Sequence, residues 1–236
     1  MEHCIIDIGR FRAVLFDMDG VVTDTMPIHL KAWQEAFRPY GVEVSCMDVY
    51  LREGMTSRAM AGAIATEKDK GLSAEALDKI TEDKGRIFDR EAGALARTFD
   101  CVPETLHMLR NNGIKTALIT GSSARAVSKV LKLTRIEQLF DVIVTGDDTS
   151  KGKPDPEPYL LGMARLEVSR INCVVVENAP LGLQSARAAG AEYVIAVTTS
   201  LDRSFLADAD DIMDSMSELA QCFARRFAAI PGPGSF

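Results

Sequence analysis

The 236-residue sequence has no long hydrophobic run, no closely spaced cysteine pair, no internal repeat and no excess of basic residues. Without a run of membrane-spanning length, we expect no transmembrane helix. The 27 basic side chains are outnumbered by 34 acidic ones, which gives a net charge of -7 and argues against broad binding to nucleic acid or to anionic membranes. An anionic small molecule remains possible as a substrate, because the local charge of a site can outweigh the total. With 47% hydrophobic and 26% charged residues, the composition is that of an ordinary globular protein.

The five cysteines are scattered and odd in number, at Cys4, Cys46, Cys101, Cys173 and Cys222. None of their spacings is typical of a zinc or redox motif. We therefore expect reduced cysteines and a cytoplasmic protein. Acidic residues near the N-terminus and the lack of a long apolar stretch there argue against a signal peptide.

Short apolar runs alternate with helical patterns through most of the chain. The runs lie at residues 13–16, 116–119, 142–144, 173–176 and 194–197, and they are contiguous as in buried strands. Helices are predicted after Pro103, after Ser122 or Ser123, after Pro156 and after Pro180. This alternation predicts an α/β fold, a Rossmann-like doubly wound parallel sheet with helices on both faces. Ligands of such sheets bind at the carboxyl ends of the strands.

Residues 27–93 differ, because they show helical patterns and no convincing strand. We expect an inserted helical cap domain at 27–93 over the strand ends, and an α/β core domain formed by 1–26 and 94–236. The sequence Pro231-Gly232-Pro233-Gly234 predicts a C-terminal tail without regular structure.

Polar side chains follow the expected strands and should meet at one edge of the sheet. Asp17 and Asp19 follow the first run, Thr120-Gly121-Ser122-Ser123 the second, Lys153 the third and Glu177-Asn178 the fourth. A carboxylate pair at the end of a buried strand is costly unless a cation or hydrogen bonds satisfy it. Oxygen ligands suit Mg²⁺, whereas a hydroxyl, glycine-rich backbone and lysine suit phosphate. Together these groups favour phosphoryl transfer.

The segment Asp17-Met18-Asp19-Gly20-Val21-Val22-Thr23-Asp24-Thr25 resembles the first motif of the haloacid dehalogenase superfamily. The spacing of Thr120, Lys153 and Glu177-Asn178 resembles its remaining motifs. The helical segment resembles the cap of the subgroup that contains β-phosphoglucomutase and phosphoglycolate phosphatase.

This resemblance implies a role for each of these residues. Asp17 would be the nucleophile that forms an aspartyl-phosphate, and Asp19 the general acid and base. Thr120 would hydrogen-bond the transferring phosphoryl group and Lys153 would neutralise its charge. Mg²⁺ would be held by Asp17, the Asp19 carbonyl, Asn178 and Glu177.

Asn178 departs from the family pattern, in which this position is often an acid. An amide still offers a carbonyl oxygen but no charge. We therefore expect weaker Mg²⁺ binding, or a larger role for Glu177 or for a nearby acid such as Asp147 or Asp148.

The expected substrate-binding residues are Gly121 and Ser122 in the core and His29, Trp33, Arg52 and Arg58 in the cap. His29 and Trp33 are four residues apart on one helical face and resemble cap-entrance positions of β-phosphoglucomutase. A partly buried histidine beside a core tryptophan is an equally good interpretation. Arg52, Glu53, Gly54 and Arg58 are candidates for a substrate loop. Its arginines would suit a second phosphate or a sugar acid, but ordinary surface charge explains them as well.

The sequence thus predicts a Mg²⁺-dependent phosphatase, most simply a monomer, that acts on a small phosphorylated metabolite. A hexose phosphate mutase of the β-phosphoglucomutase type is the alternative, and Ser123, where the mutase has a lysine, favours the phosphatase. A non-catalytic binding protein on the same fold is a third possibility, with Asn178 as its only support.

Overall fold

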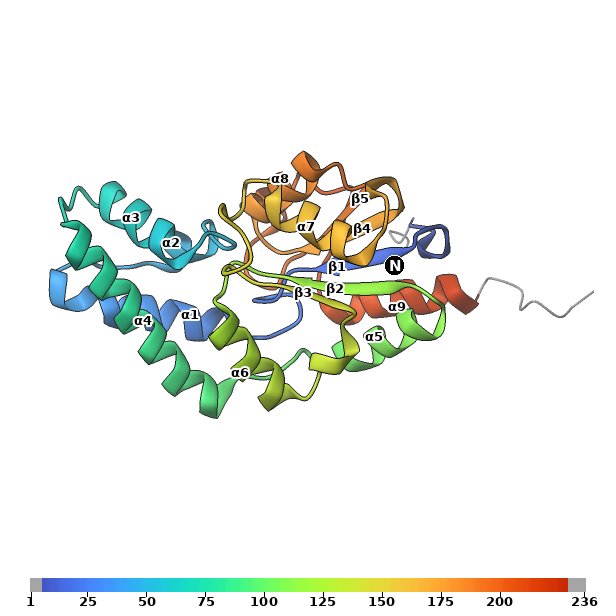
Figure 1. The fold of residues 1–236 in the computed structure, drawn as a ribbon, viewed down its shortest axis with the longest axis horizontal. Coiled ribbons are helices and arrows are strands. Elements are labelled where there is room, and N and C mark those ends of the chain that lie inside the picture. The colour runs from blue at the N-terminus through green and yellow to red at the C-terminus, as the bar shows by residue number, and fades with distance from the viewer. Residues whose placement is uncertain (1–5, 229–236) are drawn as a thin grey trace, which may run out of the picture.

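Six parallel strands form one sheet at the centre of the protein, in a computed structural model that describes residues 6–228 (Figure 1). The order across the sheet is β3-β2-β1-β4-β5-β6. The strands are β1 (Ala13–Phe16), β2 (Lys115–Ile119), β3 (Val142–Val144), β4 (Cys173–Glu177), β5 (Tyr193–Val197) and β6 (Asp211–Met213). The α/β prediction is confirmed, and five strands match the apolar runs. The sequence pattern does not indicate β6, because this edge strand has only two apolar residues.

Helices cover both faces of the sheet, as its alternating side chains require. Val14 and Phe16 of β1 belong to a core shared with α5, α6 and α9, whereas Leu15 belongs to one shared with α7 and α8. The two sets lie below and above the sheet in Figure 1. The helices are α5 (Val102–Asn111), α6 (Ala124–Thr134), α7 (Glu157–Leu166), α8 (Pro180–Ala189) and α9 (Met216–Ala228). Of the two candidate caps for α6, Ser123 is the one used, and its Oγ accepts the Ala126 N–H at 3.4 Å.

Four helices occupy the chain between β1 and α5, and we refer to them as the helical unit. They are α1 (Met26–Phe37), α2 (Cys46–Tyr50), α3 (Ser57–Glu67) and α4 (Ala74–Leu95). The unit lies beyond the carboxyl ends of the strands (Figure 1) and has its own core, which includes Trp33. Ile28 of α1 and Phe88 of α4, however, pack into the core of the sheet. A separate cap domain with boundaries at 27 and 93 therefore remains a prediction.

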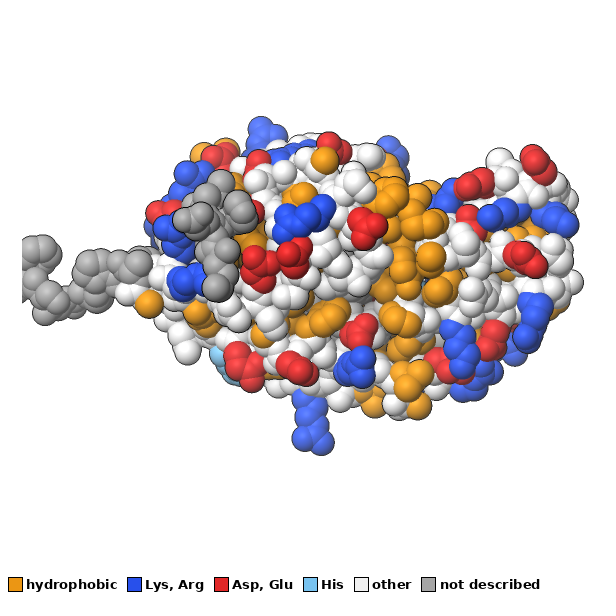
Figure 2. Space-filling view, turned by 180° about the vertical axis from the view of Figure 1, so that it is seen from behind, with side chains coloured by type: hydrophobic (Ala, Val, Ile, Leu, Met, Phe, Trp, Pro, Cys, Tyr) orange, Lys and Arg blue, Asp and Glu red, His pale blue; other side chains and the backbone are white. Residues whose placement is uncertain are grey.

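The surface carries interspersed charges of both signs, and hydrophobic side chains gather where the helical unit meets the sheet part of the molecule (Figure 2). No helix within residues 6–228 is long and apolar enough to cross a membrane. Cys46, Cys101 and Cys173 are free thiols, as expected. Cys222 is disulfide-bonded, so the expectation of a fully reduced set is wrong at this residue. Cys4 and the tail predicted at 231–234 lie outside the described residues.

Candidate active site

The carboxyl ends of β1 and β4 bring Asp17 and Glu177 together at the point where the strand order reverses. The Asp17 N–H donates to Val176 O at 2.9 Å, which continues the β1–β4 pairing. Lys153, from the loop after β3, places its Nζ 2.5 Å from Asp17 Oδ1 and 2.6 Å from Glu177 Oε1. All three side chains are buried. In open α/β sheets, this reversal of strand order is where ligands bind.

Burial and neighbouring charge oppose each other in this cluster. Burial raises the pKa of Asp17 to about 8, against the influence of Lys153, and the charges of Glu177 and Asp19 raise it further. Lys153 loses hydration, which lowers its pKa, but the two carboxylates outweigh that loss and hold the pKa well above the usual value. The lysine is therefore a permanent cation beside Asp17. Tyr159 of α7 also donates to Glu177 Oε1 at 2.6 Å.

Asp19 is held by partners from both the helical unit and the core. Thr25 donates to its Oδ1, and Ser122 donates to its Oδ2 at 3.1 Å. His29 Nε2 of α1 lies 3.1 Å from Oδ1. Burial alone would raise the pKa of Asp19. The opposing effects of His29, Thr25 and Lys84 are larger together, so the pKa of Asp19 is lowered. His29 itself has a lowered pKa, because it is buried and faces Lys84.

Lys84 of α4 is a buried cation next to this pair. Its Nζ lies 3.0 Å from His29 Nδ1 and over the rings of Trp33 and Phe88, 5.3 and 5.1 Å from their centroids. Burial lowers its pKa. The sequence did not single out Lys84 as a site residue, because it lies within a heavily charged stretch. Its position four residues from both Ile80 and Phe88, on the apolar stripe of α4, was the available signal.

The loop between α2 and α3 of the helical unit packs against the core loops that carry Thr120 and Lys153. Lys153 N–H donates to Gly54 O at 3.2 Å, and a Cβ built on Gly121 would come within 2.6 Å of the same oxygen. Thr120 is buried at the end of β2, where its Oγ1 accepts the Ser122 N–H at 3.1 Å. Glycine at 121 is needed because no side chain fits between the two loops.

Asn178 binds the backbone at Asp19 rather than a side chain of the Asp17 cluster. Its Nδ2 donates to Asp19 O and to Ser200 Oγ, both at 3.1 Å. Its Oδ1 is buried without a hydrogen-bond partner, and so is Asp17 Oδ2. The site thus contains two oxygens, from neighbouring strands, that lack a donor.

Comparison with known proteins agrees with this geometry. The family model of haloacid dehalogenase-like hydrolases matches residues 14–196. The phosphorylated carbohydrates phosphatase of Thermotoga maritima is 36% identical over 197 residues, which cover 80% of this chain and 87% of that protein. The fructose-1-phosphate phosphatase of Escherichia coli is 31% identical over 78% of this chain and 96% of its own. A solved structure titled putative β-phosphoglucomutase from Bacteroides vulgatus has a TM-score of 0.82 and 28% identity, and covers 92% of this chain and 89% of that one.

The chain belongs to the haloacid dehalogenase-like hydrolase family. It is an enzyme of that family, since the similar proteins are named as enzymes over nearly their whole length. This counts against a non-catalytic binding protein.

The residues of this hydrolase suit a hard divalent cation. Asp17 Oδ2 and Asn178 Oδ1 are oxygen ligands in need of a partner, and the Asp19 carbonyl lies against Asn178. Among residues 6–228 there is no cluster of three His, Cys, Asp or Glu side chains suited to a metal. The lack of such a cluster follows from Asn178 and from the engagement of Glu177 with Lys153, Tyr159 and the Asn178 N–H. Asp147 and Asp148 are engaged elsewhere, with Ala124 N–H and with Thr145 and Arg165.

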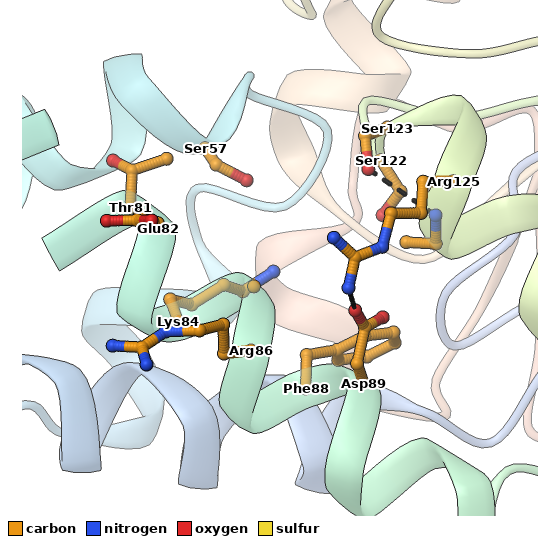
Figure 3. Close-up of a pocket in the computed structure, with 12 residues that line it drawn as sticks. Ser57, Thr81, Glu82, Lys84, Arg86, Phe88, Asp89, Ser122, Ser123 and Arg125 are labelled. Carbon is orange, nitrogen blue, oxygen red and sulfur yellow. Dashed lines mark hydrogen bonds and ion pairs between the residues drawn. The ribbon is translucent and has the colours of Figure 1, made fainter. Parts of the chain in front are cut away.

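The cavity above Asp19 is small and opens toward a larger cleft. Its volume is about 10 Å³, room for a single water, so this hydrolase must open to admit a metabolite. The lining residues are His29, Trp33, Glu53, Met55, Ser57, Met60, Lys84, Gly121 and Ser122. The adjacent cleft, of about 300 Å³, lies between α4 and the start of α6, where Arg125 pairs with Asp89 (Figure 3).

Four of the expected substrate-binding residues line this cavity, and two do not. His29, Trp33, Gly121 and Ser122 are there, and both interpretations of the first two fit, since each is buried. The side chains of Arg52 and Arg58 form ion pairs with Glu67 and Asp78 instead. Their role in substrate binding stays a prediction. Glu53, which belongs to the same candidate substrate loop, does line the cavity.

Proposed function

We propose that the protein is a Mg²⁺-dependent phosphatase that hydrolyses a small phosphorylated carbohydrate through an aspartyl-phosphate. The observation that carries this proposal is the Asp17–Lys153–Glu177 cluster next to the separately held Asp19. Asp17 and Asp19 are two residues apart but have different partners, Lys153 for the first and His29 and Ser122 for the second, so separate nucleophile and acid–base roles are open to them.

In this proposal Asp17 attacks the phosphorus through its carboxylate. Lys153 holds the attacking carboxylate and faces the charge that develops on the phosphoryl oxygens. Thr120, at the end of β2, donates a hydrogen bond to one of these oxygens. Burial of the cluster strengthens each of these interactions, because water is excluded.

Asp19 gives a proton to the leaving oxygen and later takes one from the attacking water. It must carry that proton despite its lowered pKa, and His29, at 3.1 Å, is the group placed to exchange it. Ser122 and Thr25 fix the orientation of the Asp19 carboxyl during both steps.

Asp17, the Asp19 carbonyl and Asn178 would hold Mg²⁺, with Glu177 as a fourth ligand if it leaves Lys153. When bound, Mg²⁺ supplies positive charge that lets the anionic Asp17 and phosphate approach each other. With a neutral amide at position 178, we expect Mg²⁺ to bind more weakly than it would to an acid there.

The proposed substrate class comes from the relatives that the chain matches, which are named for phosphorylated carbohydrates and fructose 1-phosphate. Hydrolysis is favoured over the mutase reaction, because the relatives at 36% and 31% identity are named phosphatases and Ser123 stands where the mutase has a lysine.

The deciding experiment measures phosphate release from a panel of sugar phosphates with Mg²⁺, with EDTA, and with the Asp17→Asn variant. We expect release that needs Mg²⁺ and is lost in the variant. Conversion of β-glucose 1-phosphate to glucose 6-phosphate without phosphate release would instead show a mutase. A folded protein that is inert toward the whole panel would contradict both reactions.

A further inference from the structure

The loop between α2 and α3 presents an acid, not an arginine, to the cavity. Arg52 bonds the carbonyl of Asp48 at 3.0 Å and pairs with Glu67, and Arg58 pairs with Asp78 at 2.5 Å on the outer side. Between them, Glu53 is only 7% exposed and lines the cavity. The residue types that would bind a second anionic group are thus turned away from the site and already neutralised.

The Glu53 carboxylate has no hydrogen bond or ion pair with any side chain in the described part of the protein. Other buried acids at this site do have such partners, as Lys153 holds Asp17 and Thr25 holds Asp19. Burial without a partner is costly for a carboxylate. The Glu53 oxygens are not fully enclosed, so their donor can be a water in the cavity or the ligand that displaces it.

The same cavity is also lined by a donor, Lys84. Lys84 directs one bond to His29 and has two further N–H groups, and both Lys84 and Glu53 line the cavity without forming an ion pair with each other. A hydroxyl group donates one hydrogen bond and accepts another, so hydroxyls can satisfy Glu53 and Lys84 together. A second phosphate or a carboxylate would satisfy Lys84 but brings no donor for Glu53, and it would repel the ionised form of that side chain.

We propose that Glu53 determines substrate specificity: it accepts hydrogen bonds from hydroxyls on the leaving half of the substrate and disfavours substrates with a second anionic group. This inference rests on the proposed function for the identity of the site, and it narrows the substrates to neutral polyol or sugar monophosphates. The apolar faces of Trp33 and Met60 on the same cavity suit the carbon skeleton of such a molecule.

The test measures binding by calorimetry in the Asp17→Asn background, so that the result does not depend on turnover. The probes are fructose 1-phosphate, fructose 1,6-bisphosphate and p-nitrophenyl phosphate, which has no hydroxyls on its leaving group. Glu53→Gln removes the charge and Glu53→Ala removes the acceptor as well. Glu43→Gln, at an exposed acid of the same unit, is the matched control.

With Glu53 present, we expect the monophosphate to bind about tenfold more tightly than the bisphosphate. Glu53→Gln should reduce that preference to about twofold, and Glu53→Ala should also weaken binding of fructose 1-phosphate about tenfold. Binding of p-nitrophenyl phosphate should stay within about twofold, and the Glu43→Gln control should behave as its parent.

An unchanged preference in Glu53→Gln, or an equal loss for all three probes, would overturn the inference. The proposed function fails separately, if the unaltered protein releases no phosphate while the binding preference and its dependence on Glu53 persist. A folded Asp17→Asn protein that binds none of the probes would overturn both.

Discussion

The two sides of the active site satisfy their buried charges in different ways. On the sheet side, Lys153 lies within 2.6 Å of both Asp17 and Glu177, so each carboxylate is paired with a cation before any ligand arrives. On the helical side, Glu53 is buried with no bonded side-chain partner in the described part of the chain, and it faces Lys84 across a cavity.

This difference assigns the stabilisation of reaction charge to one side of the site and the discrimination between substrates to the other. A cluster whose ion pairs are already formed is preorganised, so it can stabilise charge that develops in the reaction without rearranging. The cavity residues Glu53 and Lys84 gain further hydrogen-bond partners only from a water or a ligand in the cavity, so they discriminate between ligands that can and cannot supply them. Substitutions on the sheet side should therefore lower turnover, whereas substitutions on the helical side should change substrate preference.

Removing the shared cation of the sheet side should have the largest effect. Lys153→Met leaves two buried carboxylates facing each other, and we expect kcat for phosphate release to fall about 100-fold or more. Lys151→Met is the matched control, because Lys151 lies two residues away, is exposed and pairs only with Asp155 at 3.3 Å. Near-normal turnover in Lys153→Met would show that the ion pairs of Lys153 with Asp17 and Glu177 do not serve catalysis.

The contact between the helical unit and the loop of Lys153 can be broken by a substitution at Gly54. Gly54 has φ +90°, and a Cβ there would lie 2.5 Å from Cδ of Lys153. Gly54→Ala should therefore displace Lys153 and lower kcat about tenfold or more, besides a strain of about 1 kcal/mol in the backbone. Gly71→Ala, where no atom lies within 4 Å of the new methyl group, should leave kcat unchanged. Equal kinetics for the two variants would mean that the loop does not control the lysine.

The same contrast explains what the sequence could predict. Asp17, Lys153 and Glu177 follow strands, and the ends of parallel strands meet at one edge, so their meeting follows from the strand pattern. Which residues of the helical unit face the site depends on how four helices pack, and no strand register fixes that. The sequence placed Glu53 in a candidate substrate loop with the two arginines, but no pattern indicated that the acid is the one of them that lines the cavity.

The buried cation of the helical side gives an intermediate effect. Lys84→Met keeps the bulk but removes the bond to His29 Nδ1, so we expect kcat/KM to fall about tenfold. Removing a buried charge should not destabilise the protein, and chemical denaturation should give an equal or higher free energy of unfolding. Lys79→Met, at an exposed position of α4, should change neither quantity. A large loss of stability in Lys84→Met would indicate a structural role instead.

The unpartnered acid should lower stability at neutral pH. Burial, with Asp19 and Asp17 nearby, raises the pKa of Glu53 well above its usual 4.5. A carboxyl whose pKa is raised in the folded state opposes folding as the pH rises above its unfolded value. Glu53→Gln should therefore raise the thermal unfolding midpoint, and the gain should grow as the pH rises above about 4.5. A gain that does not depend on pH would contradict this origin.

A fully partnered acid outside the site should show the opposite trend, with the smallest effect. Asp148 accepts hydrogen bonds from Thr145 and, with Arg165, these lower its pKa from 3.8 to about 2. A lowered pKa stabilises the folded state above the unfolded value, and the benefit disappears as the pH falls through the folded one. Asp148→Asn should thus lower the unfolding midpoint slightly at pH 6, and the deficit should shrink below about pH 4, where the unfolded chain takes up its proton. If Asp148→Asn and Glu53→Gln instead shared one pH trend, partnering would not be what distinguishes the two acids.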